Sequence, residues 1–92
     1  MPVPHMHETS LIPDLMAKIS QVARDNGAAR VTAVEVTIGA LAAIGPDHLR
    51  EHFLAAAAGT PAEGADLRIT VDDDPLATDA FAIRLLAVEV DS

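Results

Sequence analysis

A short segment near the beginning of the chain places two imidazoles and a carboxylate next to one another. His5, Met6, His7 and Glu8 are consecutive there. Neutral imidazole suits nickel, copper and zinc, and a planar set of nitrogen and oxygen ligands favours Ni(II) or Cu(II). A deprotonated backbone amide between the side chains can complete such a set. The segment is a candidate metal site, and the simpler interpretation is an ordinary solvated stretch near a chain end.

A second pair of histidines, His48 and His52, is separated by one helical turn. Residues at positions i and i+4 lie on the same side of a helix, so the two rings could chelate one metal ion. Asp47 and Glu51 could add oxygen ligands. Two imidazoles alone leave a weak and open site. Two histidines scattered on an exposed helix face are the competing interpretation.

An acidic cluster is the third candidate. Asp72, Asp73 and Asp74 are consecutive, and Asp79 follows shortly after. Oxygen ligands suit Ca²⁺ or Mg²⁺, but this spacing does not match the alternating ligands and the glycine turn of an EF-hand loop. A solvated loop is the preferred interpretation of this cluster.

The chain shows no pattern typical of a covalent catalyst. Ser10, Ser20 and Ser92 are not in a G-x-S-x-G nucleophile elbow. There is no glycine-rich loop of the kind that cradles phosphate. Glu35 and Glu89 fall in predicted strands without a paired acid or base. We therefore expect that the protein is not an enzyme.

The composition narrows the class of protein further. The 92 residues suffice for one domain, half of them are hydrophobic, and the net charge is −8. This acidic balance argues against binding to nucleic acid or to anionic membranes. The absence of cysteine excludes disulfides and thiolate zinc sites. No apolar run approaches the ~20 residues that span a bilayer, and the first residues do not resemble a secretory signal, so we expect a cytoplasmic protein.

Hydrophobic periodicity predicts the elements that position these residues. Apolar residues at helical spacing predict a helix over residues 10–26, with Thr9 or Ser10 as its cap, Pro13 in its first turn and Gly27 at its end. A second helix is predicted over 46–58, starting at Pro46.

Alternating apolar residues predict strands over 30–38, 67–71 and 81–90. In the last strand the apolar phase changes between Leu85 and Leu86, which indicates either a β-bulge or a strand covered on both faces. The predicted fold class is α+β: a single two-layer domain of order α-β-α-β-β, with a three-stranded mixed sheet and two helices. We expect the last two strands to form a hairpin and the first two to be joined by a right-handed crossover.

Five segments, in the same order, resemble the HypA/HybF family of nickel-incorporation proteins in nickel–iron hydrogenase maturation. The first is Met-His-Glu-Thr-Ser-Leu, which leads directly into the first helix. The second ends in Ile-Gly-Ala-Leu, where the family has Ile-Gly-Glu-Leu, so Ala40 replaces the usual acidic residue. The resemblance covers the chain from residue 6 to residue 90, in segments 6–11, 34–41, 46–53, 59–67 and 83–89.

The resemblance implies a nickel metallochaperone. Members of the family bind Ni(II) at the N-terminus and pass it toward the hydrogenase large subunit, together with a nickel-handling GTPase. Carried over to this chain, His7 is the principal ligand, Glu8 is a supporting ligand and Met6 contributes its backbone nitrogen. His5, His48 and His52 are further possible ligands that the family pattern does not require.

The chain departs from the family in two further ways. The family carries two CxxC pairs that hold zinc between its last two strands, whereas only residues 72–80 stand here, without cysteine, so we expect no structural zinc. Five residues also precede Met6. We expect residues 1–5 to be a flexible extension of a nickel-binding domain over 6–92. Translation from Met6 would restore a free amine next to His7. Because His7 is bulky and would then be the second residue, we expect Met6 to stay in place.

Two hypotheses follow from these observations. The first is a nickel metallochaperone that uses His7 and Glu8. The alternative is a metal-independent protein-interaction or regulatory module on the same fold, motivated by the missing zinc module and by the extension.

Overall fold

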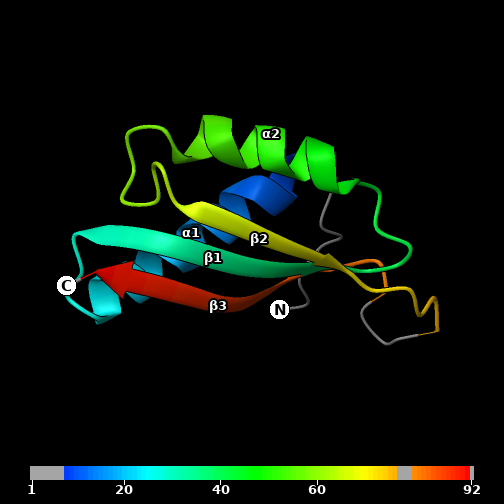
Figure 1. The fold of residues 1–92 in the computed structure, drawn as a ribbon. Coiled ribbons are helices and arrows are strands. Elements are labelled where there is room, and N and C mark those ends of the chain that lie inside the picture. The colour runs from blue at the N-terminus through cyan, green and yellow to red at the C-terminus, as the bar shows by residue number, and fades with distance from the viewer. Residues whose placement is uncertain (1–7, 77–79, 92) are drawn as a thin grey trace, which may run out of the picture.

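The structure is a computed structural model that describes residues 8–76 and 80–91 (Figure 1). Its elements are α1 (Glu8–Asp25), β1 (Arg30–Ile38), α2 (Pro46–Ala57), β2 (Asp66–Val71) and β3 (Ile83–Asp91). The three strands form one sheet in the order β2-β1-β3. β2 runs parallel to β1 and β3 runs antiparallel to it. The predicted α+β class, the element order and the mixed sheet are therefore confirmed.

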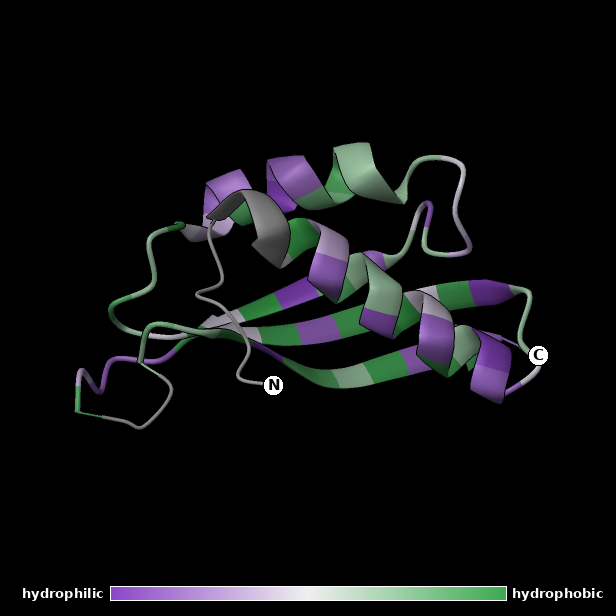
Figure 2. Ribbon diagram, turned by 180° about the vertical axis from the view of Figure 1, so that it is seen from behind, coloured by the Kyte–Doolittle hydropathy of each residue, from purple (hydrophilic) through white to green (hydrophobic). Residues whose placement is uncertain are grey.

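Both helices cover the same face of the sheet (Figure 2). α1 packs on β1 and β3, whereas α2 packs on β2 and on α1. The other face of the sheet is open, which is why polar and apolar residues alternate along the strands. Aliphatic side chains from all layers meet between helices and sheet. The largest fully buried side chains are Phe53, Ile19, Leu49, Val31, Val34 and Val36.

The ends of the helices follow from particular residues. Gly27 has a φ of +61° and Gly59 a φ of +77°, so each supplies the left-handed conformation after a helix, as predicted for Gly27. Pro46 occupies the start of α2, where its missing N–H needs no partner.

The start of α1 differs from the prediction. α1 begins at Glu8, so Thr9 and Ser10 lie within the helix rather than at its cap, and Pro13 lies beyond the first turn. A proline inside a helix cannot donate to the carbonyl four residues before it. The backbone bond from residue 13 to Thr9 is therefore missing from α1.

The predicted hairpin of the last two strands is wrong. β2 and β3 are the two edges of the sheet, and each pairs with β1. The connection after β2 is too long for a tight turn, so nothing local forces its flanking strands to pair. It instead crosses the end of β1, where the Leu41 N–H donates to the Ala80 carbonyl at 2.7 Å and the Gly39 N–H donates to the Ala82 carbonyl at 2.8 Å.

The phase change in the last strand is a β-bulge. Glu35 pairs with Ala87 and Val36 with Leu85, so Leu86 has no partner in β1. The extra residue lets both halves of β3 direct apolar side chains to the core, namely Ile83 and Leu85 before the bulge and Val88 and Val90 after it. The strand begins at Ile83 rather than at Phe81, whose side chain is 74% exposed.

Candidate metal centre

The main residues of the predicted nickel site are at the edge of the described structure. His5, Met6 and His7 lie outside the described residues. Glu8 is the first residue of α1. Of this segment the structure therefore places only the backbone of Glu8, and the ligand roles of these residues stay predictions.

Several elements start or finish at the end of the molecule from which α1 begins (Figure 1). α2 begins there, β1 and β2 finish there, and β3 starts there. Residues 39–45, 72–76 and 80–82 belong to the same end. A metal ion bound beside Glu8 would consequently lie near several loops as well as near the first turns of both helices.

His48 and His52 are both exposed on α2. Their ring centroids are 6.1 Å apart and the ring planes meet at 67°. On the opposite side of the helix Leu49 and Phe53 are buried. Arg50 fixes the helix to the sheet, because its Nη1 donates to the Leu67 carbonyl at 3.0 Å. The structure thus brings these two predicted histidines together on one firmly packed helix.

Two aspartates of the acidic cluster accept hydrogen bonds from the backbone of the loop that follows β2. The Asp72 carboxylate accepts the Asp74 N–H at 3.1 Å, and the Asp74 carboxylate accepts the Leu76 N–H at 2.9 Å. These are turn-forming bonds of the kind that aspartate makes with backbone two residues ahead. Asp79 lies outside the described residues. Across residues 8–76 and 80–91, no three His, Cys, Asp or Glu side chains come together in a way that could hold a metal ion.

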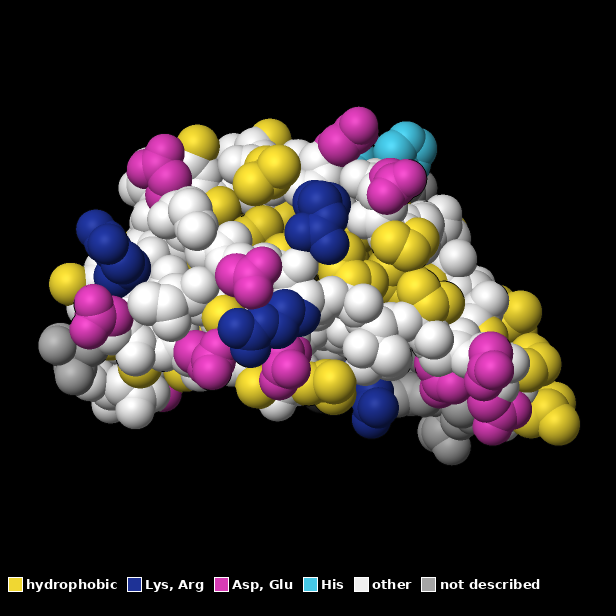
Figure 3. All heavy atoms as spheres, viewed as in Figure 1, with side chains coloured by type: hydrophobic (Ala, Val, Ile, Leu, Met, Phe, Trp, Pro, Cys, Tyr) yellow, Lys and Arg dark blue, Asp and Glu magenta, His cyan; other side chains and the backbone are white. Residues whose placement is uncertain are grey.

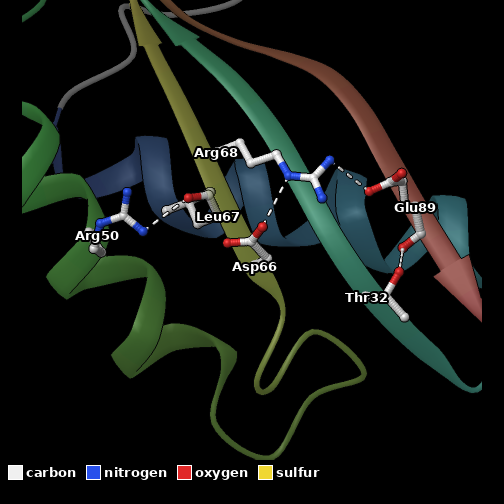
Figure 4. Close-up of polar contacts among 6 residues, drawn as sticks. All are labelled: Thr32, Arg50, Asp66, Leu67, Arg68 and Glu89. Carbon is white, nitrogen blue, oxygen red and sulfur yellow. Dashed lines mark hydrogen bonds and ion pairs between the residues drawn. The ribbon is translucent and has the colours of Figure 1, made fainter.

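Two ion pairs lie on the open face of the sheet (Figure 4). Arg68 on β2 donates from Nε to Asp66 at 3.0 Å and from Nη1 to Glu89 on β3 at 3.0 Å. Its guanidinium therefore reaches across β1. Ala33 on β1 is in register with both Asp66 and Glu89. Its side chain is buried, but it does not belong to the core cluster between the helices and the sheet. A small side chain at this position leaves room for the arginine above it.

The acidic neighbours of Arg68 favour its charged form. The hydrogen bond with Asp66, followed by the negative charge of Glu89, raises the pKa of the Arg68 guanidinium above its ordinary value. The sequence offered a weak signal for this cluster, because charged residues alternate with apolar ones along β2. It gave no sign that the partner of Arg68 would be two strands away.

Sequence reasoning also missed a set of exposed apolar side chains. Leu76 is 91% exposed and Phe81 is 74% exposed, and both belong to the segment that joins β2 to β3. Figure 3 shows apolar side chains next to acidic ones at this end of the molecule. Val71 and Leu41, at the ends of the neighbouring segments, are also partly exposed.

A shallow groove runs between α1 and the start of β3. Its lining carries two cationic side chains, Lys18 and Arg84, and no acidic or imidazole group. Such a lining does not suit a metal cation. In the described part of the chain, no helix is both long enough and apolar enough to span a bilayer.

Comparison with known proteins identifies relatives of the sequence. Residues 6–76 match the family model described as hydrogenase/urease nickel incorporation, metallochaperone, hypA. A hydrogenase maturation factor HypA of Chlorobium limicola is 48% identical over 64 residues, which is 70% of this chain and 55% of that protein. A hydrogenase maturation factor HypA of Chloroflexus aurantiacus is 44% identical over 64 residues, or 70% of this chain and 56% of that protein. The chain thus spans about half the length of these curated relatives.

A solved structure shares the fold. The solution structure of the Ni metallochaperone HypA from Helicobacter pylori superposes with a TM-score of 0.75 at 23% sequence identity. The match covers 92% of this chain and 97% of that one. At this level of identity, the likeness supports the arrangement of helices and strands.

Proposed function

The chain belongs to the HypA family, and from that membership we propose that it is an accessory protein that delivers Ni(II) during the maturation of nickel–iron hydrogenase. The observation that carries the proposal is the family match, which begins at Met6 and so includes the segment with His7 and Glu8. The start of α1 at Glu8 supports it, because the helix provides a fixed base for this segment.

We assign the ligand roles as follows. The His7 imidazole is the principal ligand, the Glu8 carboxylate supports it, and Met6 contributes backbone nitrogen. Nitrogen and oxygen ligands in a planar arrangement suit Ni(II). Ligands drawn from consecutive residues can be replaced one at a time by those of an acceptor, which is what delivery by ligand exchange requires. The acceptor is the hydrogenase large subunit, and a nickel-handling GTPase is the second partner.

Calorimetric titration with Ni(II) tests the assignment of His7. In the form that begins at Met6 and carries His48→Ala and His52→Ala, Ni(II) should bind at one ion per chain with a clear heat signal, and His7→Ala should lose that transition. Glu8→Gln should weaken binding less, because it keeps the imidazole. Thr9→Ala is the matched control, since it changes a neighbouring residue that has no ligand role. Equal binding by this form with and without His7→Ala would reject the proposal.

The position of the chain's amine gives a second test of the same site. In a form that begins at Met6, the nitrogen of that residue is a free amine, whereas in a form that begins at Met1 it is an amide, a far poorer ligand. We expect the Met6 form to bind Ni(II) more tightly than the Met1 form. Intact-mass measurement of the protein from its own host establishes which form is present.

We also propose that the protein acts in the cytoplasm and without structural zinc. The sequence has no cysteine from which a thiolate zinc site could be built. Metal analysis of the purified protein after exposure to zinc should therefore find no tightly held zinc that depends on the fold.

A metal-independent interaction module is the second candidate function. The observation that favours it is the exposure of Leu76 and Phe81, since large apolar side chains in the open often mark protein contacts. Under this hypothesis the segment between β2 and β3 binds a maturation partner whether or not nickel is present.

Pull-down with the purified hydrogenase large subunit or the GTPase separates the two candidates. Capture that is unaffected by nickel and by His7→Ala but is lost with Leu76→Ser and Phe81→Ser would favour the interaction module. Leu54→Ser is the matched control, because Leu54 is 58% exposed on α2, away from that segment. Capture that requires nickel and His7 would favour delivery.

A further inference from the structure

α2 carries two histidines one turn apart on its exposed side. The ring centroids of His48 and His52 are 6.1 Å apart. Among the described residues, neither ring has a recorded hydrogen bond or ion pair that would hold it in another position. The backbone beneath them is fixed, because Leu49 and Phe53 are buried on the opposite side of the helix. The pair therefore combines a rigid base with rings that are free to turn.

This arrangement matches what a chelating pair of imidazoles needs. Residues at i and i+4 have Cβ atoms about 5–6 Å apart, and a metal ion binds imidazole nitrogen at about 2.0–2.1 Å. Rotation about the side-chain torsions is sufficient to aim one nitrogen of each ring at a common point. We propose that His48 and His52 form a second metal site, which binds a divalent transition-metal ion such as Ni(II) through two imidazole nitrogens.

Nearby charges make the position acceptable for a cation. The beginning of a helix carries partial positive charge, which disfavours a bound metal ion. Asp47 is in the first turn of α2, and Glu51 lies between the two histidines in sequence. Both residues are exposed, and Figure 3 shows acidic side chains next to histidine on this part of the surface. Their negative charges offset the field of the helix.

The site leaves coordination positions for other ligands. In the described part of the chain no third His, Cys, Asp or Glu joins the pair. Water or a group of another molecule must complete the coordination. A two-ligand site of this kind binds more weakly than a closed one and exchanges its metal readily. The proposal depends only on α2 and does not require the nickel site assigned to His7.

The chain offers a clean background for a test, because it has only four histidines. His5→Ala combined with His7→Ala leaves His48 and His52 as the only imidazoles. The probe is Ni(II) alone, added to this double variant while the histidine ring signals are followed by NMR. The paramagnetic ion should broaden the signals of both rings in parallel, with saturation at one ion per chain. The melting temperature should rise, because a ligand that binds only the folded helix stabilises it.

The matched control keeps the number of histidines and changes only their spacing. In the same background, His52→Ala combined with Ala55→His places the two imidazoles two turns apart, about 10 Å along the helix. Ala55 is exposed, so the new ring requires no repacking. We expect at least about a tenfold loss of affinity, because the second ligand no longer binds intramolecularly. Circular dichroism establishes that α2 is still folded.

Two results would overturn the proposal. One is equal affinity of the double variant and the respaced control, which would mean that the rings bind Ni(II) singly. The other is the absence of parallel broadening in the double variant. Loss of the His7-dependent transition leaves binding at His48 and His52 unchanged, so the two assignments fail independently.

Discussion

In the proposed site, the His7 imidazole could bind a metal ion only when its ring nitrogen is unprotonated, so nickel binding there would be linked to pH. We expect the affinity for Ni(II) to decrease as pH falls, most clearly below about pH 6.5. Where one proton is displaced, the fall approaches about tenfold for each pH unit. Calorimetry at several pH values, on the double variant His48→Ala and His52→Ala, isolates the N-terminal site. An affinity that does not change between neutral and acidic pH would exclude the imidazole as a ligand.

Arg68 leads to a prediction about salt and pH. Asp66 and Glu89 raise the pKa of Arg68 in the folded protein. The stabilisation that this shift provides is fully present below the pKa of Arg68 in the unfolded chain, and it is lost only as pH rises through the higher pKa of the folded protein. Near neutral pH that contribution is constant. Arg68→Gln should therefore lower the urea midpoint slightly and equally at pH 6 and pH 8.

Salt provides the control for this variant. Exposed ion pairs are screened, and at about 1 M salt the Debye length is about 3 Å. The difference between Arg68→Gln and the unmodified protein should shrink there. A difference that is insensitive to salt would mean that the side chain acts by covering Ala33 rather than by its charge.

Part of the candidate site could be predicted from the types and spacing of single residues in the sequence. His7 and Glu8 were predicted as ligands because imidazole lies next to carboxylate in a segment that resembles the family, and these roles stay predictions. His48 and His52 were predicted to lie on one side of a helix because their spacing equals one helical turn, and the structure places them so. The ion pair between Arg68 and Glu89 could not be predicted from the sequence. Glu89 is two strands away, and which strands are neighbours is decided by the fold of the whole sheet rather than by local spacing.

At the scale of elements, α2 is held by its apolar side. Phe53 is 1% exposed and is among the largest fully buried side chains. Phe53→Ala removes that volume and should cost about 3–5 kcal/mol of unfolding free energy, a large share of what a small domain has. Leu54→Ala is the matched control, since Leu54 is 58% exposed and its loss should cost less than about 0.5 kcal/mol. Urea unfolding measures both, and equal costs would contradict the observed orientation of α2.

The bulge at Leu86 sets the orientation of the first part of β3. Deletion of Leu86 would remove the extra residue and leave Leu85 and Ala87 opposite Val36 and Glu35, so the strand would alternate regularly. We therefore expect this deletion to keep the protein folded. Insertion of one alanine after Leu86 would instead cause a one-residue slip, which turns one half of β3 to the other face, and should abolish cooperative unfolding.

Insertion of one alanine after Asp73 serves as the control for the insertion in β3. Asp73 is exposed in the segment after β2, where a longer loop changes no strand register. Near-ultraviolet and far-ultraviolet circular dichroism should show a folded protein for this control and for the deletion of Leu86, and a disrupted one for the insertion after Leu86. A disrupted protein without Leu86 would contradict the assigned register.

The elements were more predictable than their pairing. The apolar spacing of 10–26 and 46–58 and the alternation in 30–38 located two helices and the central strand, because periodicity is a local property. The predicted hairpin was wrong because strand pairing depends on which strands become neighbours in the folded sheet. β3 is as long as β1 and pairs with it along its whole length, whereas β2 pairs only with residues 33–38 of β1.

At the scale of the whole molecule, we expect folding to depend on the aliphatic core and not on a metal. With no cysteine in the sequence, a chelator such as EDTA should leave the melting temperature of protein purified without added nickel unchanged. Differential scanning calorimetry with and without chelator measures this. A fall of several degrees would reveal a structural metal held by other ligands.

Both helices begin at the same end of the molecule, and this bears on how firmly nickel would be retained at the proposed site (Figure 1). The amide dipoles of each helix sum to about half a positive charge at its first turn, and each such field is worth about 0.3–1 kcal/mol near an exposed ion. A cation at the proposed site beside Glu8 would thus be repelled by the helix that presents it, apart from what nearby carboxylates cancel. Under the proposed function the fold would shift the exchange equilibrium toward the acceptor, so that a carrier built this way would release its metal more easily than a storage protein.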